Sequence, residues 1–233
     1  TATWQKKQKP TPDTVNYTIN KHFKDNKGNT INEDKGTATP GTKNATLGSL
    51  ITRDEVNQTD GESKYVYVSD KTTFTMNGQK VGRDTQLTSE ATIDLYYYLD
   101  NWKDGSSVEE DNEKGGDGTP DCYQVLVKYQ SSDTNRGSVG SLTMEVLTIK
   151  SNGVYASEGQ VTATGSIATV TGNRCYFSKW TTNATVDTSK EPATLGKKTF
   201  NAKGGETYTF TANFGYSGGG GSGGSSRPST PPS

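Results

Sequence analysis

The sequence predicts a mainly β protein built from two small tandem domains. Short runs alternate apolar and polar residues, tyrosine is the most frequent aromatic residue with 12 copies, and an acidic, glycine-broken stretch separates two β-rich regions. We expect domains over 15–100 and 119–215, joined by an acidic Gly-rich linker at 101–118. Residues 1–14 are expected to form a leading linker, and 216–233, rich in Gly, Ser and Pro, a tether.

Composition and charge argue against nucleic acid and lipid bilayers as binding partners. The 233 residues include 25 basic and 26 acidic side chains, giving a net charge of −1, so the chain has no excess positive field to hold a phosphate backbone. No apolar run approaches the roughly 20 residues that span a bilayer. We therefore expect a chain that neither binds nucleic acid nor inserts into a membrane, and that is a mature or excised segment. We also expect a monomer, which the Ser-Pro-Thr continuation of the tether at 216–233 would place outside the cell.

The first domain opens and closes on strands. Alternation predicts strands over 15–23, 65–68, 72–76 and 91–100. Asn77-Gly78 is a strong signal for a tight hairpin turn, and 50–58 is the stretch of this domain that could hold a short helical turn. His22, the one histidine, is expected to be a solvent-facing strand residue.

The second domain shows a similar succession. We expect strands over 123–129, 142–149, 161–170, 174–180 and 205–214. Between Val146 and Leu147 the apolar residues change parity, which predicts a β-bulge there. The closing strand is the cleanest, because Tyr208, Phe210 and every second residue after them are apolar.

Two segments of the first domain resemble a known repeat family. The opening YTINKHFKDNKGN (17–29) resembles the Y-T-V-x-H-Y-Y-x-D-x-x-G of mucin-binding-protein-type repeats, and IDLYY (93–97) resembles their closing N-L-Y-Y. This resemblance implies a β-grasp-like α+β module from the surface of Gram-positive bacteria.

The second domain resembles a different repeat. Phe177 and Trp180 match the Y-x-F-x-G-W of Listeria-Bacteroides-type repeats, with Cys175 and Lys179 in place of the Tyr and Gly. The YTFTANF segment (208–214) is similar to that family's closing strand. Both resemblances imply repeat modules of a bacterial cell-surface or cell-wall protein.

Tyr96 and Tyr98 are the candidate binding residues. If the strand buries Ile93, Leu95 and Tyr97, alternation sends both tyrosines to the opposite face. Tyrosine offers a large contact area with few rotors and a hydroxyl for orientation, which favours it in recognition surfaces. The open alternative is that the second domain or Trp102 covers them.

The two cysteines are expected to form one disulfide. A Cys122–Cys175 bridge would close a loop of roughly 54 residues and contribute ~4 kcal/mol in the chain-entropy account; two free thiols are the alternative. Neither cysteine has metal-ligand spacing. In the acidic linker, Glu113, Asp117 and Asp121 could make at most a weak calcium site, and a solvated linker is the preferred interpretation.

These residues favour binding over catalysis. A lone histidine and two separated cysteines offer neither a nucleophile with its base nor a zinc site, so we expect no catalytic residues, metal or cofactor. The leading hypothesis is an extracellular module that recognises a host protein or glycoprotein, such as mucin or immunoglobulin. The alternatives are a structural stalk of a wall-anchored adhesin and an accessory module of a surface glycosidase, since paired carboxylates are invisible in sequence.

Overall fold

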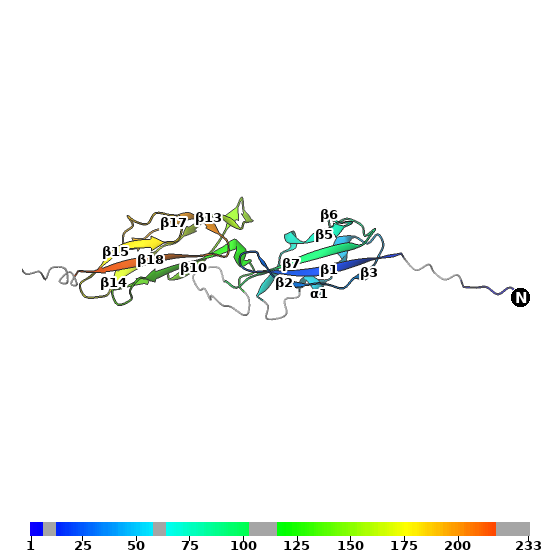
Figure 1. The fold of residues 1–233 in the computed structure, drawn as a ribbon, viewed down its shortest axis with the longest axis horizontal. Helices are drawn as coiled ribbons and strands as arrows, with labels where there is room; N and C mark the ends of the chain where they lie inside the picture. Colours follow the sequence, from blue (N-terminus) through cyan, green and yellow to red (C-terminus); the bar gives the residue numbers. More distant parts are fainter. Residues whose placement is uncertain (7–12, 58–63, 103–115, 218–233) are drawn as a thin grey trace, which may run out of the picture. The chain divides into compact units, whose positions relative to one another are not determined.

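The chain forms two compact, mainly β units. A computed structural model describes residues 1–6, 13–57, 64–102 and 116–217 (Figure 1). Unit 1 is Thr1–Leu99 and unit 2 is Asp100–Ser233, so the division falls one residue before the predicted end of the first domain. Much of the three predicted linkers (7–12, 103–115 and 218–233) lies outside the described residues.

Unit 1 is a single sheet with a short helix. Its elements are β1 (Thr14–Lys24), β2 (Thr30–Asp34), β3 (Thr39–Thr42), the 3₁₀ turn η1 (Leu47–Leu50), α1 (Arg53–Asn57), β4 (Tyr65–Tyr67), η2 (Ser69–Lys71), β5 (Thr73–Met76), β6 (Gln79–Val81) and β7 (Ala91–Leu99). The strand order is β2-β1-β7-β5-β6, with β3 also pairing β1 and β4 also pairing β7. The four predicted strands and the helical turn are therefore present, whereas β2, β3 and β6 were missed.

The first and last strands of unit 1 lie side by side and run in parallel. The register runs from Tyr17 opposite Ala91 to Lys24 opposite Tyr98, and every other pairing in this sheet is antiparallel (Figure 1). A parallel pair formed by the first and last strands therefore lies at the centre of the unit 1 sheet.

Local sequence signals fix the turns of unit 1. Asp25 accepts the N–H groups of Lys27 (2.9 Å) and Asn29 (2.8 Å), which closes the turn between β1 and β2. Asn77 and Gly78 both have positive φ, 53° and 74°, as a two-residue type I′ hairpin requires. At α1, the Thr52 hydroxyl and Glu55 carboxylate form a capping box.

One face of the unit 1 sheet carries its core. Buried apolar side chains come from every second position of β7, from β1 and β5, and from the segments that cover the sheet, and include Ile19, Leu47, Phe74, Leu87, Ile93, Leu95 and Tyr97. Tyr97 donates a hydrogen bond to the carbonyl of Glu55, which ties the sheet to α1. Burial raises the pKa of the Tyr97 hydroxyl to about 12, with smaller contributions from Tyr67 and Glu55.

Unit 2 contains more strands, in several small sheets. Its elements are η3 (Asp121–Tyr123), β8 (Gln124–Ser131), β9 (Gly137–Gly140), β10 (Met144–Thr148), β11 (Lys150–Ser151), β12 (Val154–Tyr155), β13 (Glu158–Ala163), β14 (Ser166–Val170), β15 (Cys175–Thr182), β16 (Thr194–Leu195), β17 (Lys198–Lys203) and β18 (Thr207–Tyr216). The main sheet has the order β10-β8-β18-β15. As in unit 1, the first and last strands, β8 and β18, pair in parallel at its centre.

Unit 2 buries side chains on both faces of β8. Val125, Val127 and Tyr129 join the main core with Trp180 and Phe210. On the opposite face, Leu126 and Val146 pack under Trp102, with Met144 beside them.

This second cluster corrects the predicted bulge near Val146 and Leu147. The β8–β10 register is regular from Met144 to Thr148. Val146 faces the Trp102 cluster and Leu147 faces the main core, so the change of parity reflects a strand covered on both faces.

A real bulge occurs in β15. The register passes from Phe177 opposite Phe214 to Lys179 opposite Asn213, leaving Ser178 as the extra residue. The bulge explains how Phe177 and Trp180, three positions apart, both pack on the main core.

Candidate functional site

Tyr96 and Tyr98 lie on the face of β7 predicted from the sequence. Ile93, Leu95 and Tyr97 are fully buried, whereas Tyr96 and Tyr98 on the opposite face are half-buried. The assignment of the two faces is therefore confirmed. Trp102 itself is buried against Leu126 and Val146 in unit 2.

The Tyr96 ring is held by its neighbours on β1. The imidazole of His22, its register partner, stacks on it with ring centroids 4.8 Å apart and an interplanar angle of 17°. The Lys24 ammonium lies 5.6 Å from the centroid of the same ring. These contacts fix the orientation of the tyrosine before any ligand arrives.

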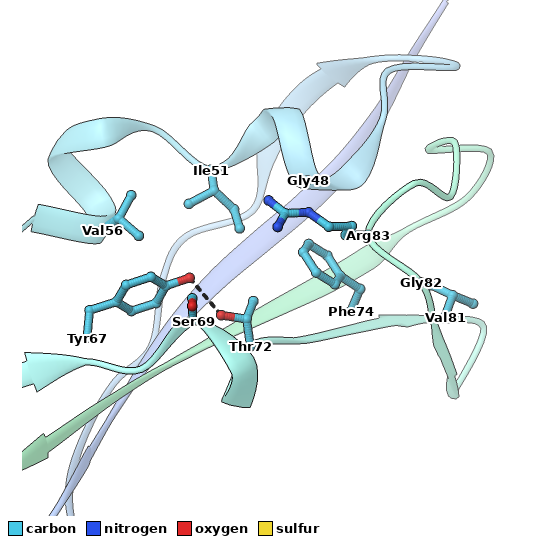
Figure 2. A pocket seen from close by; sticks show the side chains of 10 residues that line it. All are labelled: Gly48, Ile51, Val56, Tyr67, Ser69, Thr72, Phe74, Val81, Gly82 and Arg83. Atoms are coloured by element: carbon cyan, nitrogen blue, oxygen red, sulfur yellow. Dashed lines mark hydrogen bonds between the residues drawn. The ribbon is translucent and has the colours of Figure 1, made fainter. Parts of the chain in front are cut away.

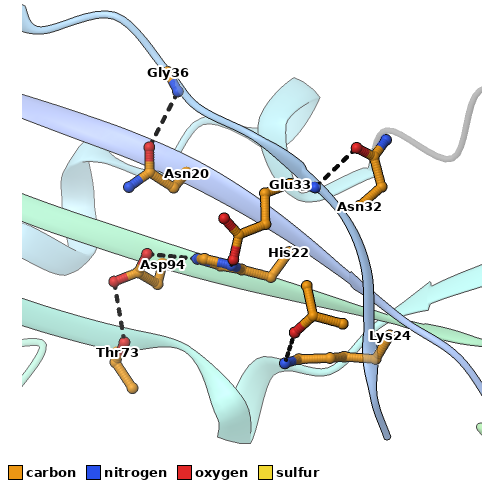
Figure 3. A network of polar contacts seen from close by, with 9 residues as sticks. Asn20, His22, Lys24, Asn32, Glu33, Gly36, Thr73 and Asp94 are labelled. Carbon is orange, nitrogen blue, oxygen red and sulfur yellow. Dashed lines mark hydrogen bonds and ion pairs between the residues drawn. The ribbon is translucent and has the colours of Figure 1, made fainter.

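His22 is the centre of a polar network on this face (Figure 3). Its Nε2 is 2.6 Å from Asp94 Oδ1 on β7, and its Nδ1 is 3.0 Å from Glu33 Oε1 on β2. The Thr73 hydroxyl on β5 donates to the other Asp94 oxygen at 3.4 Å. The network thus joins four strands, β2, β1, β7 and β5.

The histidine is less accessible than the sequence suggested. It does lie on the face away from the core, but its side chain is only 15% exposed. Because carboxylates face both ring nitrogens, both contacts are hydrogen bonds only when the ring carries two protons. Both ring nitrogens therefore face carboxylates of the network.

A pocket of about 460 Å³ opens on the core side of the same sheet (Figure 2). Ile51, Val56 and Phe74 give it an apolar lining, and in this view the Arg83 guanidinium lies between Ile51 and Phe74. The Tyr67 and Thr72 hydroxyls, 2.7 Å apart, face the pocket beside Ser69. The volume is within the range of small-molecule sites.

The sequence analysis missed this pocket. Its lining comes from η1, α1, β4, η2, β5, β6 and the adjoining loops, which no local pattern brings together. Arg83 stands beside Gly82 and Asp84 in a turn-like stretch and gave no signal of its own.

The acidic segment contributes hydrogen bonds within unit 2. Asp100 accepts the N–H groups of Asp117 (3.2 Å) and Gly118 (2.6 Å), and Asp121 accepts those of Asn101 (2.9 and 3.0 Å) and Trp102 (3.0 Å). Each carboxylate thus accepts hydrogen bonds from backbone N–H groups that lie close in sequence to the other carboxylate. Residues on both sides of 103–115 are therefore part of unit 2, which corrects the view that 101–118 is wholly a linker.

Burial changes the acidity of this pair. It raises the pKa of Asp100 to about 7 and that of Asp121 to about 6, against the opposing effect of the backbone N–H donors. Asp117 adds repulsion to both.

The weak calcium site considered above involves the same segment. Glu113 lies outside the described residues, and the Asp117 carboxylate accepts hydrogen bonds from Thr119 (2.9 Å) and Gln124 (2.6 Å). Across the described ranges, no three His, Cys, Asp or Glu side chains are grouped to hold a metal ion.

The predicted disulfide is not formed. Neither Cys122 nor Cys175 is joined in a disulfide. Cys175 pairs with Tyr216 at the end of β18, whereas Cys122 adjoins Gly204, before that strand begins. At ~3.3 Å per residue the ten residues of β18 separate the cysteines by about 30 Å, and a bridge needs Cα atoms within ~7 Å.

Comparisons with known proteins leave the family open. No protein-family model matches the sequence, and no curated protein matches it. Among solved structures, "Crystal structure of Mub-RV" is 12% identical, with 84% of this chain and 98% of that chain covered and a TM-score of 0.18. A score this low carries no argument about fold or function. In the part of the chain that the structure describes, no helix is long and apolar enough to span a membrane.

Proposed function

We propose that the chain is a non-catalytic binding module of a bacterial surface protein, located outside the cell. Unit 1 captures a host protein or glycoprotein, such as mucin or immunoglobulin, through the face that carries Tyr96 and Tyr98. The observation that supports this most is the fixed Tyr96 ring, stacked on His22 and flanked by Lys24. A ring that is already oriented loses little entropy when a partner contacts it.

The surroundings of Tyr96 suit a polar, hydroxyl-rich or peptide surface. Lys24 and Glu33 contribute opposite charges near the ring, and the Lys24 ammonium reaches the Thr30 hydroxyl at 2.5 Å. A partner can combine stacking on the ring with hydrogen bonds around it. The engagement of both His22 nitrogens supports a binding role over general base catalysis.

Alanine substitution of the two tyrosines tests this proposal. Tyr96→Ala with Tyr98→Ala is expected to weaken capture of immobilised mucin or immunoglobulin by ~2 kcal/mol or more, about 30-fold, because paired tyrosine anchors contribute energies of this order. The control is Tyr176→Ala in unit 2, which removes a tyrosine that is 51% exposed. If the double variant keeps its circular dichroism and melting temperature and still binds as before, the interface lies elsewhere.

A stalk is the second candidate, and one observation favours it. In each unit the first and last strands run in parallel, so the chain enters at one end of the strand pair and leaves at the other. Tension between the ends then acts along the strands and strains all the hydrogen bonds of the pair together. That geometry suits a spacer that must stay folded while a distal domain is held under tension.

A further inference from the structure

The pocket beside Arg83 carries an inference that is independent of the tyrosine face. Phe74, which lines the pocket, and Thr73, which contacts the His22 network, are neighbours on β5 and point to opposite faces. A ligand in this pocket therefore does not touch Tyr96 or Tyr98. Ligand binding in the pocket can therefore be tested independently of the tyrosine face.

Arg83 supplies the one charged side chain among the described residues that line the pocket. The described residues offer it no ion-pair partner. In Figure 2 the guanidinium is seen between the apolar side chains of Ile51 and Phe74. Arg83 is exposed at the edge of the pocket, and its planar fork is suited to two parallel hydrogen bonds with a carboxylate.

Gly48 helps to set the position of the guanidinium. Its N–H donates to the Arg83 carbonyl at 2.8 Å, which joins η1 to the loop after β6. A Cβ atom at this position would lie 3.0 Å from Arg83 Nε, so the arginine packs closely because residue 48 has no side chain. The side chain is thus placed by a specific backbone contact.

The other residues of the lining indicate what kind of chemical group the ligand carries beside its negative charge. Ile51, Val56 and Phe74 offer a compact apolar surface. The Tyr67 and Thr72 hydroxyls hydrogen-bond to each other, so a ligand reaching them meets a pair that is already ordered. A ligand with one negative group on a small aliphatic body satisfies both parts of the pocket.

We infer that this pocket binds a carboxylate carried on a compact aliphatic body, with Arg83 as the bidentate anchor. Such a group occurs in free small carboxylates and at the C-terminus of a peptide that ends in an aliphatic residue. Both sources present the same chemistry to Arg83. The two sources differ because the peptide residues that precede a C-terminal carboxylate can add contacts, whereas a free small carboxylate has none.

The test is a titration of the full chain, monitored by amide chemical shifts. The probes are N-acetyl-leucine and its uncharged match, N-acetyl-leucinamide; the tripeptide Ala-Ala-Leu, with a free or amidated C-terminus, distinguishes the two sources. Both carboxylates are expected to shift the Gly48 and Gly82 signals, with dissociation constants in the millimolar range for ligands of about a dozen heavy atoms. Tighter binding of the tripeptide indicates a peptide end, and equal binding indicates a free small carboxylate.

Variants separate charge from position. Arg83→Gln is expected to weaken N-acetyl-leucine binding about tenfold, as for loss of a charge-assisted bond. Gly48→Ala keeps the charge but displaces the guanidinium, and a loss of about twofold to fivefold is expected. Lys80→Gln, which removes an exposed cation on β6 outside the lining, should leave binding unchanged.

Equal binding of the amide and the carboxylate overturns the inference. Unchanged binding of N-acetyl-leucine by folded Arg83→Gln also overturns it. The same holds if Lys80→Gln weakens binding as much as Arg83→Gln does, because the attraction would then be unspecific. If Arg83→Gln does not fold, the comparison of acid and amide on the parent chain still decides.

Discussion

Unit 2 should resist force applied along its terminal strands and yield when the same strands are peeled apart. The two pulling directions can be compared in one background, Cys122→Ala with Cys175→Ala, using thiols introduced as handles. Thr119→Cys with Ser217→Cys places handles at opposite ends of the β8–β18 pair. Thr119→Cys with Lys203→Cys places both at the same end.

The register gives the expected contrast. Six residue pairs, from Leu126 opposite Thr207 to Ser131 opposite Ala212, share the tension when the handles are at opposite ends. When the handles are at the same end, the pairs are strained one after another. We therefore expect a several-fold higher unfolding force between 119 and 217. Full extension of that segment, roughly 98 residues at ~0.36 nm less a folded span of ~4 nm, should add about 31 nm.

Optical-tweezers extension traces measure both quantities. The two variants keep the same native unit and differ in one handle, which lies at the end of β17 in one variant and after β18 in the other. A higher force between 119 and 217 therefore reports on loading along the β8–β18 pair. Equal unfolding forces in the two directions would show that the parallel pair is not what resists tension, and would remove the main support for the stalk. A shorter extension would show that part of the segment stays folded.

Three further predictions concern unit 2. Burial raises the folded-state pKa of Asp100 to about 7, so the folded state binds more protons than the unfolded state between about pH 4 and 7, and the stability that this group contributes is full below about pH 4 and lost as the pH rises to 7. The melting temperature should therefore be higher at pH 5.5 than at pH 8. Asp100→Asn should reduce that difference. Without reductant, Cys175 should react with iodoacetamide in the folded protein, and the buried Cys122 should react only after unfolding. Mass spectrometry should show two thiols. An intact mass lower by two hydrogens would show instead that the disulfide is present. Trp180→Ala should cost ~3–5 kcal/mol of unfolding free energy in urea, since the side chain is fully buried, whereas exposed Tyr216→Ala should cost under ~1.

Local patterns predicted much of the secondary structure. Alternation in 91–100 and 205–214 identified β7 and β18 and their buried faces, because a strand with one covered face records burial at every second residue. Asn77-Gly78 predicted its hairpin because few other residue pairs adopt two positive φ angles. β2 was missed, because all five of its residues are exposed and leave no apolar pattern.

Long-range pairing was not available from these patterns. The disulfide prediction failed because loop length gives no distance, and the parallel β8–β18 pair places the cysteines at opposite ends. The bulge predicted at Val146 failed for the same reason, since nothing local to β10 shows that Trp102 covers its outer face. The Arg83 pocket depends on six elements and their adjoining loops, which meet only in the folded unit.

The two binding hypotheses for unit 1 are separable because strand alternation divides their residues. Tyr96 and the His22 network occupy the face away from the core, and Phe74 and Arg83 belong to the pocket on the other side. A variant that removes one surface leaves the contacts of the other in place. Loss of mucin or immunoglobulin capture in the Tyr96 and Tyr98 variant, with carboxylate binding intact, would mean that unit 1 presents two surfaces. If Arg83→Gln also abolished capture of the same partner, the partner would have to reach around the sheet edge, and the β5–β6 hairpin would then be the place to look for its contacts.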